Sequence, residues 1–155
     1  MKKLLTHLSF FAAALMVMGA TVTASYADGM ADIKARQALM KAIGSEMKAI
    51  GAIAKGQGDA SKLAGHTNEL AALAKKSAAS FPAGSGPEAG ETRAKANIWT
   101  DTANFAKVNA AFVSTTEALA AAGASGDLKA VGAAMGMVGK DGCGACHKTY
   151  RAKKS

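Results

Sequence analysis

Apolar residues recur at helical spacing in four separate stretches of the chain, and this pattern limits the folds that it can adopt. Residues three, four or seven positions apart lie on one face of an α-helix. A helix with a single apolar face cannot bury that face alone, so four such faces are expected to share one core. The sequence therefore predicts an all-α fold, an antiparallel four-helix bundle with short connections. The predicted helices cover residues 31–55, 59–80, 91–122 and 127–153.

Residues that end or begin helices separate these four stretches. Gly56 to Gly58 follow the first stretch, residues 81–90 hold both prolines of the chain, and Gly123 to Gly126 form the third turn. Asp59 is placed to cap the second helix. The residues expected on the apolar stripes are Ile33, Met40, Ile43, Met47, Ile50, Ala54, Leu63, His66, Leu70, Leu73, Ile98, Phe105, Phe112, Leu119, Leu128, Val131, Met135 and Val138.

Near the end of the fourth predicted helix, Cys143, Cys146 and His147 form the run CGACH. Spacings of three and four residues place these side chains on one helix face. Two thiols can then bond to the vinyl groups of a porphyrin while the imidazole reaches its iron. The C-x-x-C-H pattern therefore indicates one covalently bound haem c, with Cys143 and Cys146 as the attachment points and His147 as an iron ligand.

The two cysteines are also compatible with other chemistry. Thiol redox pairs of the C-x-x-C type usually follow a strand in a βαβ unit, and no such unit is predicted here. Half of a zinc site is a second option, but no other cysteine pair completes four ligands, and only His7 and His66 remain elsewhere. A plain disulfide would close a tight loop. Haem attachment accounts for the adjacent histidine as well, and we favour it.

The N-terminus has the three parts of a secretory signal peptide. Lys2 and Lys3 form the charged start, residues 4–18 form the apolar centre, and residues 25–27 (Ser-Tyr-Ala) place small residues at a cleavage site. We expect residues 1–27 to be removed, which leaves residues 28–155 as a periplasmic domain. The apolar run is short for a membrane span, so no stable membrane anchor is expected after cleavage.

Loss of the two signal-peptide lysines lowers the formal net charge from +8 to +6 (8 − 2). Basic residues gather at Lys148, Arg151, Lys153 and Lys154. This charge favours transient docking to acidic redox proteins. Nucleic acid is not an expected partner, because few aromatic residues accompany the basic ones. No nucleophile with a base, carboxylate pair or phosphate loop stands out, so we do not expect an enzyme.

A haem bound through His147 leaves the opposite face of its iron open, and methionine is a usual ligand on that side. Met135 and Met137 share the helix of His147, so they cannot reach around to the other face. Met40 and Met47 both lie on the apolar stripe of the first predicted helix. Their spacing alone does not separate these two candidates.

With the haem motif near the end of a four-helix chain, the sequence resembles the class II cytochromes c, the cytochrome c′ family. Class I cytochromes c carry this motif near the start. The resemblance covers residues 30–152 and implies a four-helix bundle with one covalent haem c. Further likenesses are Arg36-Gln37, Met40-Lys41, Gly44, the run 51–56, Ile98-Trp99, Val138-Gly139-Lys140 and Tyr150-Arg151.

Within that family, the residue four positions after the first-helix arginine faces the distal side of the haem. High-spin members have an apolar residue there, and low-spin members have a methionine that binds the iron. Met40 stands four residues after Arg36. The resemblance therefore implies a six-coordinate His147/Met40 haem of the low-spin cytochrome c-556 type, with Arg36 near a propionate. From the residues alone, Arg36 either binds such an anion or reaches water along its stem.

These inferences lead to two expected functions. A closed His/Met iron suits a periplasmic electron carrier, which is the function that we expect. The alternative is a five-coordinate, cytochrome c′-like protein that binds nitric oxide or carbon monoxide. His66 is expected to be partly buried and hydrogen-bonded rather than an iron ligand. Both monomer and homodimer remain open, since high-spin relatives often pair through their first two helices.

Overall fold

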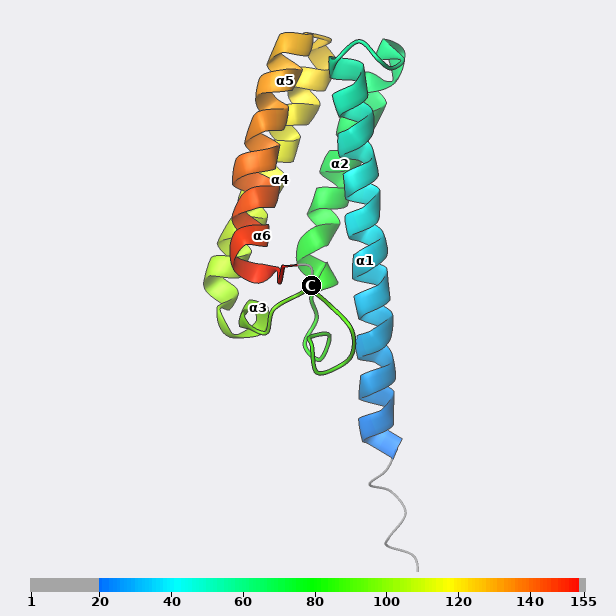
Figure 1. The fold of residues 1–155 in the computed structure, drawn as a ribbon, viewed down its shortest axis with the longest axis vertical. Coiled ribbons are helices and arrows are strands. Elements are labelled where there is room, and N and C mark those ends of the chain that lie inside the picture. Colours follow the sequence, from blue (N-terminus) through cyan, green and yellow to red (C-terminus); the bar gives the residue numbers. More distant parts are fainter. Residues whose placement is uncertain (1–19, 154–155) are drawn as a thin grey trace, which may run out of the picture.

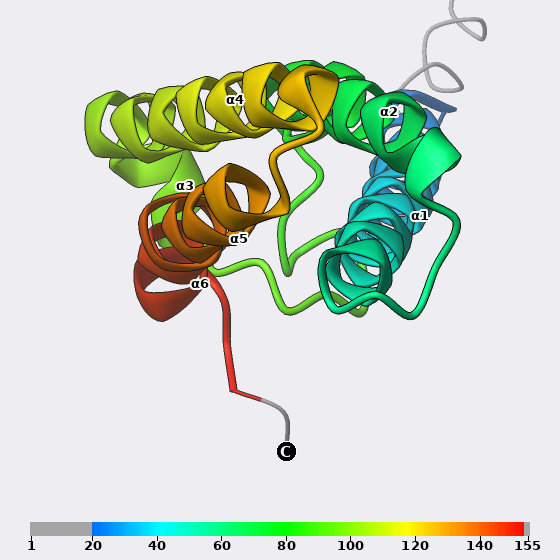
Figure 2. The ribbon, with the colours of Figure 1, turned by 90° about the horizontal axis from the view of Figure 1, so that it is seen from above.

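The computed structural model describes residues 20–153, which form an antiparallel four-helix bundle, as predicted (Figure 1). The helices are α1 (Ala20–Ala54), α2 (Leu63–Ser77), α3 (Asn97–Thr100), α4 (Thr102–Ser125), α5 (Leu128–Met137) and α6 (Ala145–Tyr150). Short 3-10 turns, Ala60–Lys62 and Ala78–Ser80, flank α2. A π-helical segment, Val138–Gly144, joins α5 to α6, so that these three elements form one continuous rod (Figure 2). We call this segment the π-turn.

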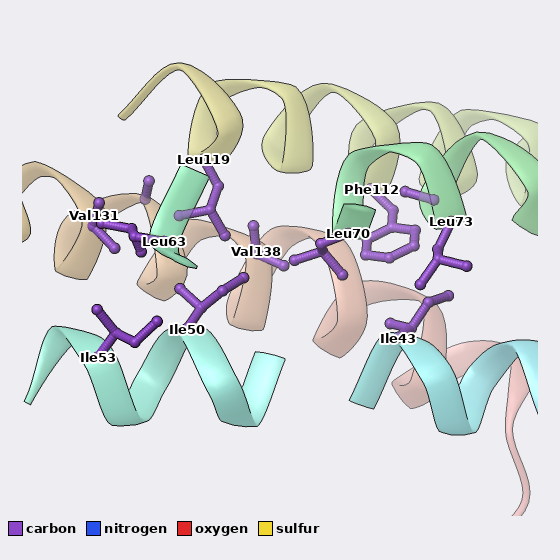
Figure 3. Close-up of a cluster of buried hydrophobic side chains, with 12 residues drawn as sticks. Ile43, Ile50, Ile53, Leu63, Leu70, Leu73, Phe112, Leu119, Val131 and Val138 are labelled. Atoms are coloured by element: carbon purple, nitrogen blue, oxygen red, sulfur yellow. The ribbon is translucent and has the colours of Figure 1, made fainter. Parts of the chain in front are cut away.

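Side chains from all four helical rods meet in the main core (Figure 3). Ile50, Leu70, Leu119, Val131 and Val138 are fully buried there. Each was expected on an apolar stripe, and each contributes about 1.5–3 kcal/mol by leaving water. The stripes therefore predicted the centre of the bundle correctly. They failed at the start of the fourth rod, where Leu128 is 39% exposed.

The first helix begins earlier than expected. α1 starts at Ala20 rather than near residue 31, because no proline interrupts the residues in between and the single glycine there, Gly29, is tolerated inside the helix. It ends at Ala54, close to the predicted end, and Gly56 follows with a φ of 73°. Most of the predicted signal peptide, residues 1–19, lies outside the described residues. Within residues 20–153, no helix has the length and apolar character that a membrane crossing requires.

The predicted start of the third helix near residue 91 is wrong. Ala94 forms an isolated antiparallel bridge with Arg151, and the helices begin only at α3 and α4. The Thr92 Oγ1 atom accepts a hydrogen bond from the Ala94 backbone nitrogen, which satisfies that donor outside a helix. The same pairing ends the fourth rod at Tyr150 rather than near residue 153, because the chain beyond it runs alongside residues 93–95.

One of the predicted turn glycines lies inside a helix. Gly123 is buried within α4, where a side chain would collide with Thr67 of α2, so the glycine lets the two helices approach closely. The actual turn is made by Gly126, whose φ of 71° is one that other residues rarely adopt. Asp59 accepts a hydrogen bond from the Ser61 backbone nitrogen and thus caps the 3-10 turn Ala60–Lys62 that leads into α2. α2 itself begins after Lys62 without a side-chain cap, so the prediction that Asp59 caps this helix is wrong in its position.

Residues 81–96 connect α2 to α3 without forming a helix themselves. Both views show this segment spanning the space between the lower part of α1 and the end of the bundle that carries α3 and α6 (Figures 1 and 2). We call it the strap. It lies at the end of the bundle that holds the CGACH motif.

Candidate haem site

A cavity of about 690 Å³ lies between α1, the strap and the rod that carries CGACH. This volume falls within the range of roughly 300–1,000 Å³ that is common for cofactor sites. The cavity brings together all the residues that the sequence singled out for the haem: Arg36, Met40, Cys143, Cys146 and His147.

The π-turn places the two cysteines in different parts of the rod. Cys143 lies within the π-turn, whereas Cys146 and His147 lie on α6. π-helical turns insert an extra residue into a helix and often occur at functional sites. Gly142, within the turn, packs directly against α4, because an added Cβ would lie 2.9 Å from a ring carbon of Phe112. The sequence reading assumed a regular helix here and missed the turn, although three glycines among residues 139–144 were a usable signal.

The two thiols are not prepared for redox exchange. Both cysteines are free and half-buried. Burial raises the pKa of Cys143, and burial together with the neighbouring Cys143 raises the pKa of Cys146. Thiol oxidoreductases instead depress the pKa of their attacking cysteine so that the thiolate forms near neutral pH. This arrangement suits covalent attachment of a cofactor better than thiol exchange.

The imidazole of His147 is held in a form that can bind a metal. Partial burial lowers the pKa of His147, and the positive charges of Arg151 and Arg93 lower it further. A neutral imidazole is the form that ligates metal ions. Arg151 Nη1 lies 3.3 Å from His147 Nδ1. Because a guanidinium only donates, Nδ1 accepts in this contact and the neutral ring carries its proton on Nε2. Iron binding through Nε2 would therefore require that proton to move to Nδ1 and this contact to be given up.

Two methionines of α1 line the cavity. Met40 and Met47 are both half-buried, and both contribute to the lining. The cavity therefore contains the thioether that a His/Met haem requires, while Met40 as the specific ligand stays a prediction. Met135, on the rod of His147, packs near Gly51 and is not part of the lining.

Arg36 is deeply buried, and four of its five N–H donors bind acceptors within the chain. The residue is only 4% exposed. Nη1 donates to the Ser80 carbonyl (3.0 Å) and to Ser85 Oγ (2.9 Å). Nη2 donates to the Ser85 carbonyl (2.8 Å) and to Thr92 Oγ1 (3.3 Å). The expected alternative of a side chain reaching water is wrong, whereas a propionate contact stays a prediction. The sequence reading missed these acceptors because they are distant in the chain.

His66 lies apart from the cavity. Its Nδ1 atom is 2.7 Å from Glu46 Oε2, and its side chain is 31% exposed. The expectation of a partly buried, hydrogen-bonded histidine is confirmed, and His66 is not among the residues that line the haem cavity.

The remaining lining fits a porphyrin. Phe81, Phe105 and Phe112 supply apolar walls, and haem pockets depend on such walls to control polarity and access to the iron. Two thiols at attachment spacing, a neutral imidazole and a thioether complete the set of groups. The donor set and the cavity therefore fit a covalently bound haem.

Comparison with known proteins agrees with this site. A family model described as cytochrome c′ matches residues 31–151. The chain belongs to the cytochrome c′ family. Members of this family bind one covalently attached haem c, and CGACH provides the attachment site in this chain.

Two curated relatives match part of this cytochrome. Cytochrome c′ of Alcaligenes xylosoxydans xylosoxydans is 44% identical over 71 residues, which cover 46% of this chain and 54% of the relative. Cytochrome c-556 of Agrobacterium tumefaciens (strain B2A) is 42% identical over 81 residues, which cover 52% of this chain and 62% of the relative. The matched segments thus span a little more than half the length of these relatives.

Solved cytochromes c′ share the fold over most of the chain. A ferrous variant from Alcaligenes xylosoxidans with bound nitric oxide superposes with a TM-score of 0.73 at 31% identity, covering 81% of this chain and 97% of that one. A carbon monoxide-bound variant gives 0.72 at 31% identity with the same coverage. Cytochrome c′ from Rubrivivax gelatinosus gives 0.71 at 28% identity, covering 78% and 94%.

Proposed function

We propose that this cytochrome c′ family member is a periplasmic electron carrier whose haem c iron is bound by His147 and Met40. The observation that carries the proposal is the presence of Met40, on α1, in the same cavity as the CGACH motif. When bound, haem c supplies one-electron redox chemistry. The chain supplies two thiols that anchor it, an imidazole, and a thioether that raises the reduction potential.

The charges around the cavity support brief contact with a redox partner. Lys41, Arg93 and Arg151 belong to the lining, which contains no Asp or Glu among the described residues. A surface of one sign increases the rate at which an oppositely charged protein docks, without requiring a tight complex. We therefore propose an acidic redox protein as the partner and no catalytic role for this chain.

Gas binding is the second candidate, and the comparisons favour it over electron transfer. The similar solved structures include cytochromes c′ with bound nitric oxide and with bound carbon monoxide. In this candidate the iron face opposite His147 accepts the gas, and Met40 either stays off the iron or is displaced. Met40 is thus the residue on which the two functions differ.

Absorption spectra of the purified, haem-loaded protein decide between them. For a carrier we expect sharp low-spin bands in the reduced form that carbon monoxide does not change. Met40→Leu should convert the iron to a five-coordinate, gas-binding form. Met47→Leu is the matched control, because it removes the same group from the same helix and cavity, and it should leave the spectrum unchanged.

Other results would reject the proposal. A wild-type protein with a high-spin spectrum that shifts on addition of carbon monoxide would support gas binding instead. Loss of the low-spin bands in Met47→Leu alone would assign the ligand to Met47. The proposed export is tested separately: the mature protein should begin at Asp28 and occur in the periplasmic fraction. Sedimentation analysis distinguishes monomer from homodimer.

A further inference from the structure

The strap forms part of the haem cavity and lies between the two walls that carry the proposed iron ligands. Phe81, Thr92, Arg93 and Ala94 of the strap contribute to the cavity lining. Met40 belongs to α1, and His147 belongs to α6, which stand on either side of the strap (Figure 1). The strap is therefore placed to control the separation of these walls.

The first part of the strap, as far as Thr92, is fixed to α1 around Arg36. The guanidinium makes the four hydrogen bonds described above, which reach Ser80, Ser85 and Thr92. Its central carbon also lies 4.8 Å from the centroid of the Phe81 ring, in a cation–π arrangement. Arg36 has five N–H donors, so only its Nε–H is left for any other acceptor.

Neighbouring positions of α1 hold the same part of the strap, between Gly84 and Glu91. Gln37 Nε2 donates to the Glu91 carbonyl at 3.2 Å. Gly29 packs so closely on Gly84 and Ala89 that an added side chain would collide with both. The face of α1 that precedes Met40 is thus covered by the strap rather than by another helix.

The other end of the strap is fixed to the residues that follow the haem motif. The Lys95 backbone nitrogen donates to the Tyr150 carbonyl at 3.0 Å, and the Ala152 nitrogen donates to the Arg93 carbonyl at 2.8 Å. The Arg93 side chain adds two hydrogen bonds to the Ala152 carbonyl, from Nε at 2.9 Å and from Nη2 at 2.7 Å. Any movement of the strap here is transmitted to the end of α6.

A row of aromatic rings connects Phe81, at the start of the strap, to Tyr150 on α6. Phe81 packs edge-on against Phe105 with ring centroids 4.9 Å apart. Phe105 packs in the same way against Tyr150 at 5.2 Å. The row leads from Arg36 on α1 to Tyr150 on α6, so the two walls are linked through packed side chains as well as through the backbone.

We propose that Arg36 is a positioning residue, which acts through the strap to hold the Met40 wall of the cavity at a fixed distance from the His147 wall. The ligand role of Met40 is part of the function proposed above, and this inference depends on it. Lysine cannot replace the arginine, because a single ammonium group does not reproduce the planar fork that binds several acceptors at once. Loss of the fork releases the strap, lets the walls separate, weakens the Met40–iron bond and admits gas to the iron.

Two measurements on the haem-loaded protein test this role. Amide hydrogen exchange followed by mass spectrometry reports the strap, and stopped-flow mixing with carbon monoxide reports access to the iron. In Arg36→Met and Arg36→Lys we expect exchange in residues 84–95 and carbon monoxide association both to rise at least tenfold. Thr92→Val removes one acceptor of Arg36. It should raise strap exchange and carbon monoxide association by less than the Arg36 variants do, and it provides the test if Arg36→Met does not fold.

Leu119→Ala is the control for a general loss of stability, because this residue is fully buried in the main core, a cluster that contains no residue of the strap. It should leave both strap exchange and carbon monoxide association unchanged. Unchanged strap exchange in the Arg36 variants, or an equal local change in Leu119→Ala, overturns the proposal. Faster exchange with unaltered carbon monoxide association also overturns it. A high-spin spectrum of the wild-type protein would reject the carrier function. The role of Arg36 is tested separately, by comparing strap exchange and carbon monoxide association between the Arg36 variants and wild type.

Discussion

The contact between the π-turn and α4 leads to a prediction with a definite sign and size. In Gly142→Ala, the new Cβ would lie 2.9 Å from Phe112 Cδ2 and 3.0 Å from Thr115 Oγ1. Overpacking of this kind costs about 1–3 kcal/mol. Alanine is favoured over glycine in a helix by about 0.5–1 kcal/mol. The net loss of folding free energy is therefore about 1 kcal/mol, within limits of about 0 and 2.5 kcal/mol.

A second glycine in the same rod provides the control. Gly136 is exposed, and an added Cβ there meets nothing within 4 Å. Gly136→Ala should therefore only gain the stability that alanine brings over glycine in a helix, about 0.5–1 kcal/mol. At roughly 4 °C per kcal/mol, the first variant should melt roughly 4 °C, and at most roughly 10 °C, lower than wild type, and the second roughly 2–4 °C higher.

Thermal unfolding followed by circular dichroism on the haem-loaded proteins measures both shifts. Intact mass gives the fraction of each variant that carries haem, and Gly142→Ala should carry less because its change displaces the turn that holds Cys143. Equal shifts of the same sign in the two variants would refute the reasoning, because they would mean that the close approach to α4 does not constrain the π-turn.

Two further predictions concern the stability of the bundle. Leu119→Ala removes a fully buried side chain and should lower the free energy of unfolding by about 2–5 kcal/mol in urea titrations, whereas Leu128→Ala, at a 39% exposed position, should change it far less. Asp127 accepts hydrogen bonds from the backbone nitrogens of Lys129 and Ala130 at the start of α5. Asp127→Ala should therefore lower the free energy of unfolding by about 1 kcal/mol. Asp127→Asn keeps a capping oxygen, so its free energy of unfolding should stay near that of wild type.

The parts of the fold that follow local periodicity were predictable from the sequence. Ile50, Leu70 and Leu119 lie on regular apolar stripes, and all three are fully buried. The CGACH motif predicted the haem because its chemistry depends on a spacing of a few residues. Met40 and Met47 both line the cavity. Spacing and burial therefore do not decide which of the two binds the iron, and the spectra of the two variants are needed.

The strap was not predictable in this way. Residues 91–96 have a composition compatible with a helix, and what prevents a helix is pairing with residues 150–152, more than fifty positions away. Arg36 shows the same limit, because its acceptors Ser80, Ser85 and Thr92 are 44 to 56 positions distant. A pattern confined to neighbouring residues does not contain these contacts.

The pairing of Arg93 with Ala152 has a consequence for the order in which a newly made chain matures. Ala152 follows His147 along the chain. The hydrogen bond between Ala152 and Arg93 can therefore form only after Cys143, Cys146 and His147 have been synthesised. Haem attachment to the two cysteines can thus precede the pairing of the strap with residue 152, and this pairing would then close a cavity that already contains its cofactor.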